Sequence, residues 1–303
     1  MPSTVLHAMD YPALTLGHGT PSKRTLDLVD LTVHVYGLDE IRGSSRPLSV
    51  IIASHGRCNS VKNMHFFAVG LLGELRRLDR KGARERTHDA LVVTLDHRNH
   101  GARLKNRTAN LAFDQNPMHL ADMAATVFGA VQDHQLVIEF LPVYLFPNDE
   151  RVVDRWMATG ISLGGNTVWR LLAEEPRISV GVPIIGLPPD SFVKYLSARA
   201  VSAGLQLAPP TFPASLRPWM ERRATPGAYA GKKILTLHGA GDELVPYRHG
   251  QDDIRAVLAA AEAEGDVEIW VQDGVGHICS PEMLGRAAQW FWRWGLSEAK
   301  AAA

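Results

Sequence analysis

The sequence contains little cysteine, no excess of charge of either sign and no long uninterrupted hydrophobic run. Its two cysteines, Cys58 and Cys279, lie far apart in a chain of 303 residues. Two thiols are too few for a disulfide framework or a thiolate metal site, and they favour a cytoplasmic location. The 32 basic residues are balanced by 32 acidic ones, so no long-range field attracts nucleic acid or acidic lipids. We therefore expect no nucleic-acid partner.

Segments directed to a membrane are equally scarce. The most apolar long stretch, residues 136–146, is interrupted by Glu139 and Pro142, and it is shorter than the ~20 residues that span a bilayer. Residues 1–20 have neither a basic segment nor a continuous apolar run, so no signal peptide is expected. These features predict a cytoplasmic protein without a membrane partner.

What the sequence does contain is an alternation of short apolar runs with segments of helical spacing. Hydrophobic residues make up 46% of the chain, which is enough for a sizeable core. The expected strands are residues 31–36, 48–54, 90–95, 156–161, 178–185, 233–238 and 267–271. The expected helices are residues 66–80, 119–136, 167–174, 251–264 and 281–294. Such an alternation predicts an α/β fold with a mostly parallel sheet covered by helices on both faces.

One segment departs from this alternation. Residues 187–231 contain seven prolines, several aromatic residues and no clear strand. We interpret them as a lid-like insertion into a core formed by residues 1–186 and 232–303. Phe192 and Trp219 in this segment are candidates for the wall of a substrate pocket. The alternative is a long connector that simply packs against the sheet.

Ligands bind such sheets at the carboxyl ends of the strands, so the residues that follow each strand indicate the chemistry. The expected strand 156–161 runs into Gly160-Ile161-Ser162-Leu163-Gly164, followed by a helical segment. A strand, Gly-x-Ser-x-Gly and a helix are the context of a nucleophile elbow, in which a tight turn exposes the serine hydroxyl. Ser162 is therefore the candidate nucleophile.

A serine nucleophile requires a base and a group that orients this base. The expected strand 233–238 is followed by a glycine-rich turn that contains Asp242, and the last strand is followed by a loop that contains His277. The order Ser162, Asp242, His277 is that of one particular hydrolase fold. Glu243 is the alternative to Asp242, which we prefer because it directly follows a Gly-Ala-Gly turn.

The negative charge that develops during acyl transfer requires hydrogen-bond donors. The strand 48–54 runs into His55-Gly56-Arg57, a turn that commonly presents a backbone N–H to the elbow. We predict an oxyanion hole formed by the N–H groups of Arg57 and Leu163, with His55 as a further substrate contact. The Arg57 side chain either pairs with a substrate carboxylate or extends into solvent.

Together these residues make the sequence similar to members of the α/β-hydrolase superfamily, in its esterase, dienelactone-hydrolase and prolyl-oligopeptidase-like branches. The resemblance extends from about Leu31 to Trp294, and it includes Asp96-His97-Arg98-Asn99-His100-Gly101, an Asp-x-Arg-x-His-Gly loop that is usually structural in relatives. It implies an α/β-hydrolase fold. The His-Gly-Gly-Gly run of many lipases is absent, which disfavours a long-chain lipase.

The expected function is that of a serine hydrolase that cleaves a carboxylic ester or thioester of a small molecule through an acyl-enzyme. The alternatives are hydrolysis of a lactone, a C–C bond or a peptide on the same fold, or a binding protein without activity. No cofactor is expected. A metal site is not expected either, because the abundant histidines include no His-Glu-x-x-His helix.

Overall fold

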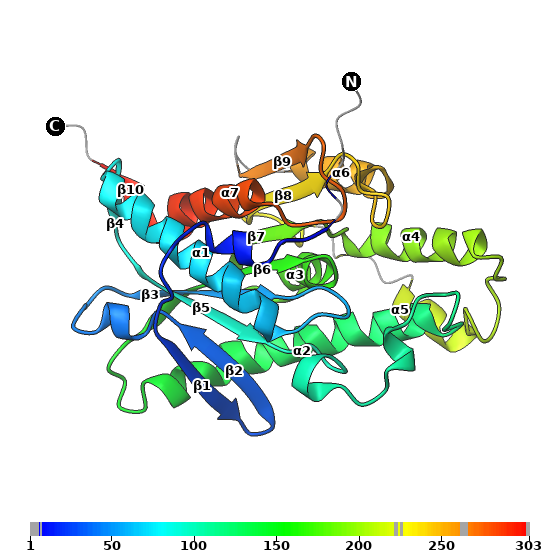
Figure 1. Cartoon of the computed structure of the whole chain (residues 1–303), viewed down its shortest axis with the longest axis horizontal. Coiled ribbons are helices and arrows are strands. Elements are labelled where there is room, and N and C mark those ends of the chain that lie inside the picture. The colour runs from blue at the N-terminus through cyan, green and yellow to red at the C-terminus, as the bar shows by residue number, and fades with distance from the viewer. Residues whose placement is uncertain (1–5, 7, 221–223, 225–226, 261–265, 301–303) are drawn as a thin grey trace.

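The structure, a computed structural model, describes residue 6, residues 8–220, residue 224 and residues 227–260 and 266–300. Its centre is an eight-stranded sheet in the order β1-β2-β5-β3-β6-β7-β8-β9 (Figure 1). The strands are β1 (Lys23–Leu28), β2 (Leu31–Tyr36), β3 (Leu48–Ser54), β5 (Asp89–Leu95), β6 (Val153–Ile161), β7 (Ile178–Ile184), β8 (Lys233–Gly239) and β9 (Val267–Gln272). A small second sheet pairs β4 (Arg84–Arg86) with β10 (Ser297–Ala299).

The predicted mostly parallel sheet is confirmed. All neighbouring strands from β5 to β9 in the sheet order run parallel, whereas β1 pairs antiparallel with β2, and β2 pairs antiparallel with β5. The central strand β3 is buried along its whole length. This burial is the reason why its sequence is apolar without alternation.

Helices cover both faces of the sheet, as predicted. They are α1 (Val61–Lys81), α2 (His119–Leu145), α3 (Leu163–Glu174), α4 (Pro189–Ser202), α5 (Arg217–Met220), α6 (Gln251–Ala259) and α7 (Pro281–Phe291), which continues into a π-helical turn (Trp292–Leu296). Helices α1 and α7 pack on one face around one apolar cluster. Helices α2, α3 and α6 pack on the other face around a second cluster.

Some predictions of local structure are wrong. Strand β1 was not expected, because its residues are mostly exposed and polar; it is a strand because its backbone pairs with β2 at the sheet edge. Helix α2 continues nine residues beyond the predicted end, through Pro142 to Leu145. The buried side chains of Val137, Ile138 and Leu141 hold this extension against the sheet, so packing outweighs the effect of the proline. Among the described residues, no helix is both long and apolar enough to cross a membrane.

The segment 187–231 contains α4 and α5, which lie at the end of the sheet near the start of α2 (Figure 1). A third apolar cluster joins α4 to the first half of α2 and to Leu163 and Val245. Leu163 directly follows the elbow serine, and Val245 lies in the turn after β8. The helices of this segment therefore pack beside the carboxyl ends of the strands.

Candidate active site

Three loops at the carboxyl ends of parallel strands bring Ser162, Asp242 and His277 together. Ser162 follows β6, Asp242 follows β8 and His277 follows β9. The Oγ of Ser162 is 2.8 Å from Nε2 of His277, and Nδ1 of His277 is 2.7 Å from Oδ2 of Asp242. With its proton on Nδ1, the imidazole donates to the carboxylate and accepts from the hydroxyl. The three predicted residues form one hydrogen-bonded chain.

The backbone at Ser162 has the geometry of a strained elbow. Ser162 has φ 57° and ψ −109°, a region that costs a side-chain-bearing residue about 1–3 kcal/mol. A Cβ on Gly160 would lie 2.5 Å from the carbonyl carbon of Gly164, and a Cβ on Gly164 would lie 2.3 Å from the carbonyl oxygen of Ser54. Glycine at position 160 lets the start of α3 lie this close to β6, and glycine at position 164 lets it lie this close to β3. The N–H of Ser162 donates to the carbonyl oxygen of Ile184 at 2.9 Å, which fixes the turn.

Asp242 is held in one orientation by its own turn. Its carboxylate is buried, and its Oδ1 accepts hydrogen bonds from the N–H groups of Leu244 at 2.9 Å and Val245 at 2.8 Å. These bonds leave Oδ2 directed at His277. The neighbouring Glu243 is exposed. Of the two acids considered from the sequence, the structure therefore places Asp242 beside the imidazole.

The turn after β3 lies directly against the serine. A Cβ on Gly56 would lie 3.6 Å from Cβ of Ser162. The carbonyl oxygen of Gly56 accepts hydrogen bonds from Nδ1 of His55 at 2.7 Å and from the N–H of Asn59 at 3.2 Å. In a trans peptide the N–H points opposite to the carbonyl. The two bonds therefore fix the direction of the Arg57 N–H, which belongs to the same peptide.

The second predicted amide is that of Leu163, the first residue of α3. The first N–H groups of a helix have no partner within the helix, and the helix dipole gives them partial positive charge. The amides of Arg57 and Leu163 thus both lie next to the nucleophile. This arrangement suits a ligand oxygen that carries negative charge.

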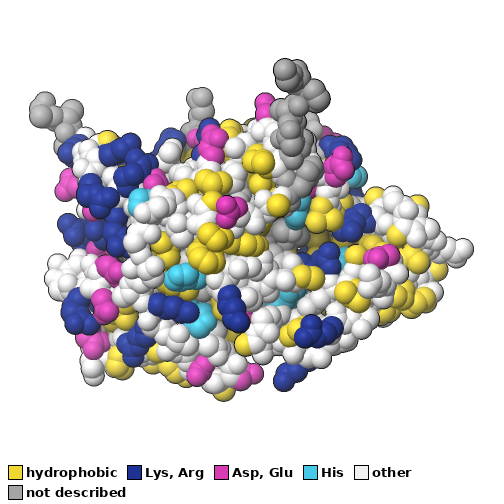
Figure 2. Space-filling model, viewed as in Figure 1, with side chains coloured by type: hydrophobic (Ala, Val, Ile, Leu, Met, Phe, Trp, Pro, Cys, Tyr) yellow, Lys and Arg dark blue, Asp and Glu magenta, His cyan; other side chains and the backbone are white. Residues whose placement is uncertain are grey.

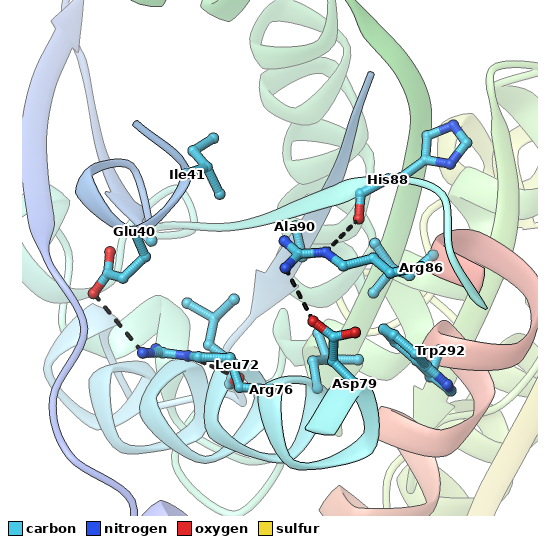
Figure 3. Close-up of a pocket in the computed structure, with 12 residues that line it drawn as sticks. Glu40, Ile41, Leu72, Arg76, Asp79, Arg86, His88, Ala90 and Trp292 are labelled. Carbon is cyan, nitrogen blue, oxygen red and sulfur yellow. Dashed lines mark hydrogen bonds and ion pairs between the residues drawn. The ribbon is translucent and has the colours of Figure 1, made fainter. Parts of the chain in front are cut away.

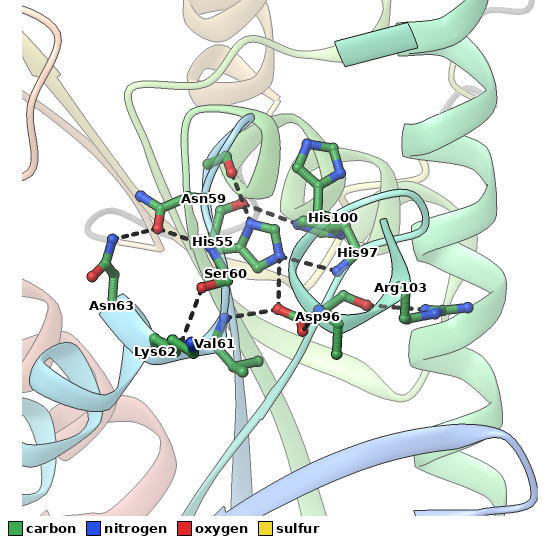
Figure 4. Close-up of polar contacts among 12 residues, drawn as sticks. His55, Asn59, Ser60, Val61, Lys62, Asn63, Asp96, His97, His100 and Arg103 are labelled. Carbon is green, nitrogen blue, oxygen red and sulfur yellow. Dashed lines mark hydrogen bonds and ion pairs between the residues drawn. The ribbon is translucent and has the colours of Figure 1, made fainter. Parts of the chain in front are cut away.

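His55 has a different position from the one expected. Its side chain is 0% exposed, so it does not reach a substrate; this corrects the prediction of a substrate contact. The N–H of His97 donates to Nε2 of His55 at 3.0 Å, which places the imidazole proton on Nδ1, the atom that donates to Gly56 (Figure 4). Burial lowers the pKa of His55 to about 4, so the ring is neutral near pH 7. His55 is a positioning residue beneath the turn.

Asp96, directly after β5, connects the loops around the site. The sequence did not predict its contacts. Its Oδ1 accepts from the N–H of Val61 at 2.8 Å (Figure 4), and its Oδ2 accepts from the N–H of Ala102 at 2.8 Å. Val61 begins α1, so the carboxylate joins the start of that helix to the loop after β5. This contact agrees with the structural role that the resemblance implied for the loop.

Further histidines are buried behind these loops. His97 is fully enclosed, and burial lowers its pKa well below the usual value. His134 on α2 lies 2.7 Å from the Oγ of Ser54 and donates from Nδ1 to the carbonyl oxygen of Ala130, and burial lowers its pKa too. Within the described part of the chain, no group of three or more His, Cys, Asp or Glu side chains could hold a metal ion.

The two aromatic residues that were predicted to contact substrate lie in different surroundings. Phe192 on α4 is buried in the same apolar cluster as Leu163, the residue that follows Ser162. Trp219 on α5 is half-buried, and its ring lies 4.7 Å from the guanidinium carbon of Arg170. Arg170 is two turns of α3 beyond the serine, roughly 12 Å along the helix. The observed contact of Trp219 is therefore with the side of α3 rather than with Ser162.

A cavity elsewhere in the molecule lacks these residues. It lies near the amino end of β5 and is lined by side chains that include Leu72, Arg76, Asp79, Arg86 and Trp292 (Figure 3). Arg86 donates to Asp79 there at 3.2 Å. The amino ends of parallel strands lie opposite to the edge that carries the elbow, so this cavity is separate from the candidate active site.

No protein-family model matches the chain, and no curated protein sequence matches it. Its structure is similar to that of TT1662 from Thermus thermophilus, with a TM-score of 0.63, 21% identity, and coverage of 90% of this chain and 98% of the other. It is also similar to the esterase Pf2001 from Pyrococcus furiosus, with a TM-score of 0.57, 18% identity, and coverage of 97% and 98%.

A third similar structure is that of Est1E from Butyrivibrio proteoclasticus bound to ferulic acid, with a TM-score of 0.56, 16% identity, and coverage of 88% of this chain and 97% of the other. At these identities the likeness establishes a shared fold along nearly the whole chain.

Proposed function

We propose that this chain, which has the α/β-hydrolase fold that its sequence predicts, is a serine hydrolase acting on carboxylic esters or thioesters of small molecules. The observation that carries the proposal is the hydrogen-bonded chain from the Oγ of Ser162 through His277 to Asp242, with Ser162 on a strained turn. A strained backbone in such surroundings is typical of a functional site.

In the first half of the reaction, Ser162 forms the acyl-enzyme. As its Oγ attacks the ester carbonyl carbon, its proton moves to Nε2 of His277. The resulting imidazolium is stabilised by Asp242, which stays ionised. The carbonyl oxygen becomes an oxyanion and receives hydrogen bonds from the N–H groups of Arg57 and Leu163. When the tetrahedral intermediate collapses, the imidazolium returns the proton to the leaving alcohol or thiol.

In the second half of the reaction, water releases the acid. His277 accepts a proton from a water molecule, whose oxygen attacks the acyl carbon while the same two amides stabilise the second oxyanion. The proton then returns to the Oγ of Ser162 as the acid leaves. Every proton that the cycle requires passes through a single imidazole, so the reaction needs no cofactor.

The similar structures support the choice of bond. Pf2001 is named an esterase, and another similar structure is named a putative dienelactone hydrolase from Klebsiella pneumoniae, with a TM-score of 0.53 and 14% identity. Acylaminoacyl peptidase from Pyrococcus horikoshii also shares the fold, with a TM-score of 0.58 and 15% identity. Two of these three names denote hydrolysis of an ester or lactone, which favours that chemistry over peptide cleavage.

Covalent labelling with a fluorophosphonate tests the activated serine. We expect the wild-type protein to be labelled on the peptide that contains Ser162, and Ser162→Ala and His277→Ala to lose the label. Ser215→Ala serves as the matched control, because Ser215 is an exposed serine outside the site. Mass spectrometry identifies the labelled peptide. A folded wild-type protein that stays unlabelled would contradict the proposal and favour a binding protein on the same fold.

A further inference from the structure

The N-terminal segment, residues 6 and 8–18, lies against the loop that carries His277. The N–H of Leu6 donates to the carbonyl oxygen of Gly274 at 2.9 Å, and the N–H of Gly276 donates to the carbonyl oxygen of Leu6 at 2.8 Å. The two bonds form a parallel β-bridge between Leu6 and Val275, two residues before His277. The side chain of Leu6 is 59% exposed. The contact is therefore made mainly by the backbone of Leu6.

The loop before His277 depends on such bonds, because the two residues that the backbone of Leu6 contacts are both glycines. Glycine loses more conformational freedom on ordering than any other residue. On the other side of the loop, the N–H of Gly241 donates to the carbonyl oxygen of Val275 at 2.9 Å. Gly241 directly precedes Asp242. The backbone before the imidazole is thus hydrogen-bonded on one side to the turn of its carboxylate partner and on the other side to Leu6.

The N-terminal segment also contacts the turn after β3. Nδ2 of Asn59 donates to the hydroxyl of Tyr11, and the N–H of Asn59 donates to the carbonyl oxygen of Gly56 at 3.2 Å. That carbonyl and the N–H of Arg57 belong to one peptide, so Tyr11 binds a residue that fixes the direction of this N–H. The side chain of Arg57 is bound separately and does not extend into solvent, because its Nη1 donates to the carbonyl oxygen of Asn110 at 2.5 Å.

The rest of the N-terminal segment is anchored to α1. Leu14 is fully buried, and its carbonyl oxygen would lie 1.9 Å from a Cβ on Gly70. Nε2 of His18 lies 2.8 Å from Oε1 of Glu74. Figure 1 shows this dark blue segment passing from α1 and α7 toward the orange loop after β9, and Figure 2 shows hydrophobic side chains gathered over the same two helices. The contacts with the two loops therefore start from a fixed support.

We infer that Leu6 and Tyr11 are positioning residues for the proposed reaction. The backbone of Leu6 keeps His277 within hydrogen-bond distance of Ser162, and the hydroxyl of Tyr11 keeps the N–H of Arg57 directed at the oxyanion. Proton transfer and charge stabilisation occur in the same transition state, so both loops must be in place together. A misplacement of about 1 Å costs about 100-fold in rate. The inference rests on the proposed function.

Substitutions at position 6 separate the backbone contact from the side chain. Leu6→Pro removes the N–H that donates to Gly274, whereas Leu6→Ala keeps both backbone bonds and shortens an exposed side chain. We expect kcat of Leu6→Pro to be about 10- to 50-fold lower than that of Leu6→Ala, with KM within about threefold, because the imidazole and not the substrate is displaced. Steady-state kinetics with a nitrophenyl ester measures both variants, and thermal unfolding checks that they are folded at the assay temperature. Equal kcat values for the two folded variants would overturn the role of Leu6.

Tyr11→Phe tests the second contact, because it removes the hydroxyl that Asn59 binds and keeps the ring. We expect kcat to fall about 3- to 10-fold with KM nearly unchanged. Tyr144→Phe is the matched control, since Tyr144 lies exposed near the end of α2, and it should keep kcat within about twofold. The role of Tyr11 would be overturned if both variants had the kcat of the wild type.

Hydrogen exchange tests the bridge without turnover. In the Ser162→Ala background, Leu6→Pro should speed amide exchange in the peptide that contains Gly276 at least about tenfold relative to Leu6→Ala, because the N–H of Gly276 loses its acceptor. Equal exchange in the two variants would overturn the inference whether or not the protein is a hydrolase. A wild-type protein that is not labelled at Ser162 would instead remove the proposed function, and the two positioning roles with it.

Discussion

The direction of the peptide between Gly56 and Arg57 is set by a buried side chain, that of His55. The carbonyl oxygen of this peptide is held by His55, and the proton of His55 is placed on Nδ1 because the N–H of His97 occupies Nε2. The opposite side of the peptide plane carries the N–H of Arg57. At the scale of the residue, the proposed oxyanion hole depends on the carbonyl of Gly56, the imidazole of His55 and the N–H of His97.

This dependence predicts different effects for two substitutions at one position. His55→Phe removes the donor to Gly56 and should lower kcat about 10- to 100-fold, because the Arg57 amide loses its fixed direction. His55→Asn places an amide N–H where Nδ1 was and should recover most of the loss. Steady-state kinetics with a nitrophenyl ester measures both variants, and thermal unfolding checks that they fold. Equal kcat values for two folded variants would contradict the role of the donor.

The carboxylate of Asp242 supports a second prediction. Asp242→Asn keeps the size of the side chain and an acceptor for the N–H groups of Leu244 and Val245, so the fold should persist. The amide favours the imidazole tautomer with its proton on Nε2, where it cannot accept from Ser162. We expect kcat to fall by about a thousandfold or more. Glu243→Gln is the control and should keep kcat within about twofold, because Glu243 is exposed.

At the scale of the residue, the sequence indicates those residues that belong to a turn with a fixed sequence pattern. Ser162 could be identified because a nucleophile elbow requires glycine two residues away on either side. The position of His55 could not be predicted, because the neighbouring Gly56 is what faces Ser162 and the imidazole turns inward.

At the scale of the element, the elbow is a contact between β3, β6 and α3 that glycine makes possible. Gly164→Ala would place a methyl group 2.3 Å from the carbonyl oxygen of Ser54. We expect this variant to lose about 1–3 kcal/mol of unfolding free energy and to lose activity, because α3 must move away from β3.

Gly285→Ala on α7 is the matched control, since a Cβ there has no heavy atom within 4 Å. It should stabilise the protein by about 0.5–1 kcal/mol through helix propensity alone. Urea unfolding measures both variants. Similar destabilisation by the two substitutions would show that the close approach to Ser54 is not the reason why position 164 requires glycine.

The strands whose positions could be predicted are those with buried apolar residues along most of their length. The expected strands 31–36 and 48–54 coincide with β2 and β3. The start of α3 was expected four residues too late, because Leu163–Asn166 continue directly from the elbow and their glycines disfavour a helix. Residues 261–264 of the expected helix 251–264 lie outside the described residues, and α6 extends from Gln251 to Ala259.

At the scale of the molecule, buried neutral histidines connect stability to pH. Burial lowers the pKa of His55, His119 and His238 to about 4, whereas in an unfolded chain each titrates near about 6.5. Between these values the unfolded state binds more protons than the folded state. The free energy of unfolding should therefore fall as the pH falls from about 6.5 to about 4, by up to about 1.4 kcal/mol per pH unit for each group.

Urea unfolding at about pH 7.5, 6 and 4.5 measures this slope. His238→Gln should lower the slope by the amount that corresponds to about one bound proton, because glutamine does not titrate. Glutamine also keeps a polar contact with Thr236, so the variant should fold. The negative charge of Asp242 favours the imidazolium form of His238 and so opposes part of the lowering of its pKa. A slope that is the same in the variant would mean that other groups cause the dependence.

The architecture of the whole molecule could be predicted because the alternation of apolar strands with helices allows few arrangements. Right-handed crossovers and double coverage follow from parallel strands such as β3 and β6. The proposed boundary of the 187–231 insertion stays a prediction. Its α4 and α5 could not be drawn from the sequence, because the prolines of that segment give no helical period.

Ser162 and His277 are separated by 115 residues along the chain, yet their side chains are 2.8 Å apart. Neither β6 nor the loop after β9 can supply the site alone, and the strands between them must be in register before the imidazole reaches the hydroxyl. With the proposed function, turnover is expected to begin only when the carboxyl half of the sheet is complete. The time at which ester hydrolysis appears during refolding would therefore report when this part of the sheet is assembled. Comparing that time with the recovery of helical circular dichroism would show whether the sheet is completed before or after the helices form.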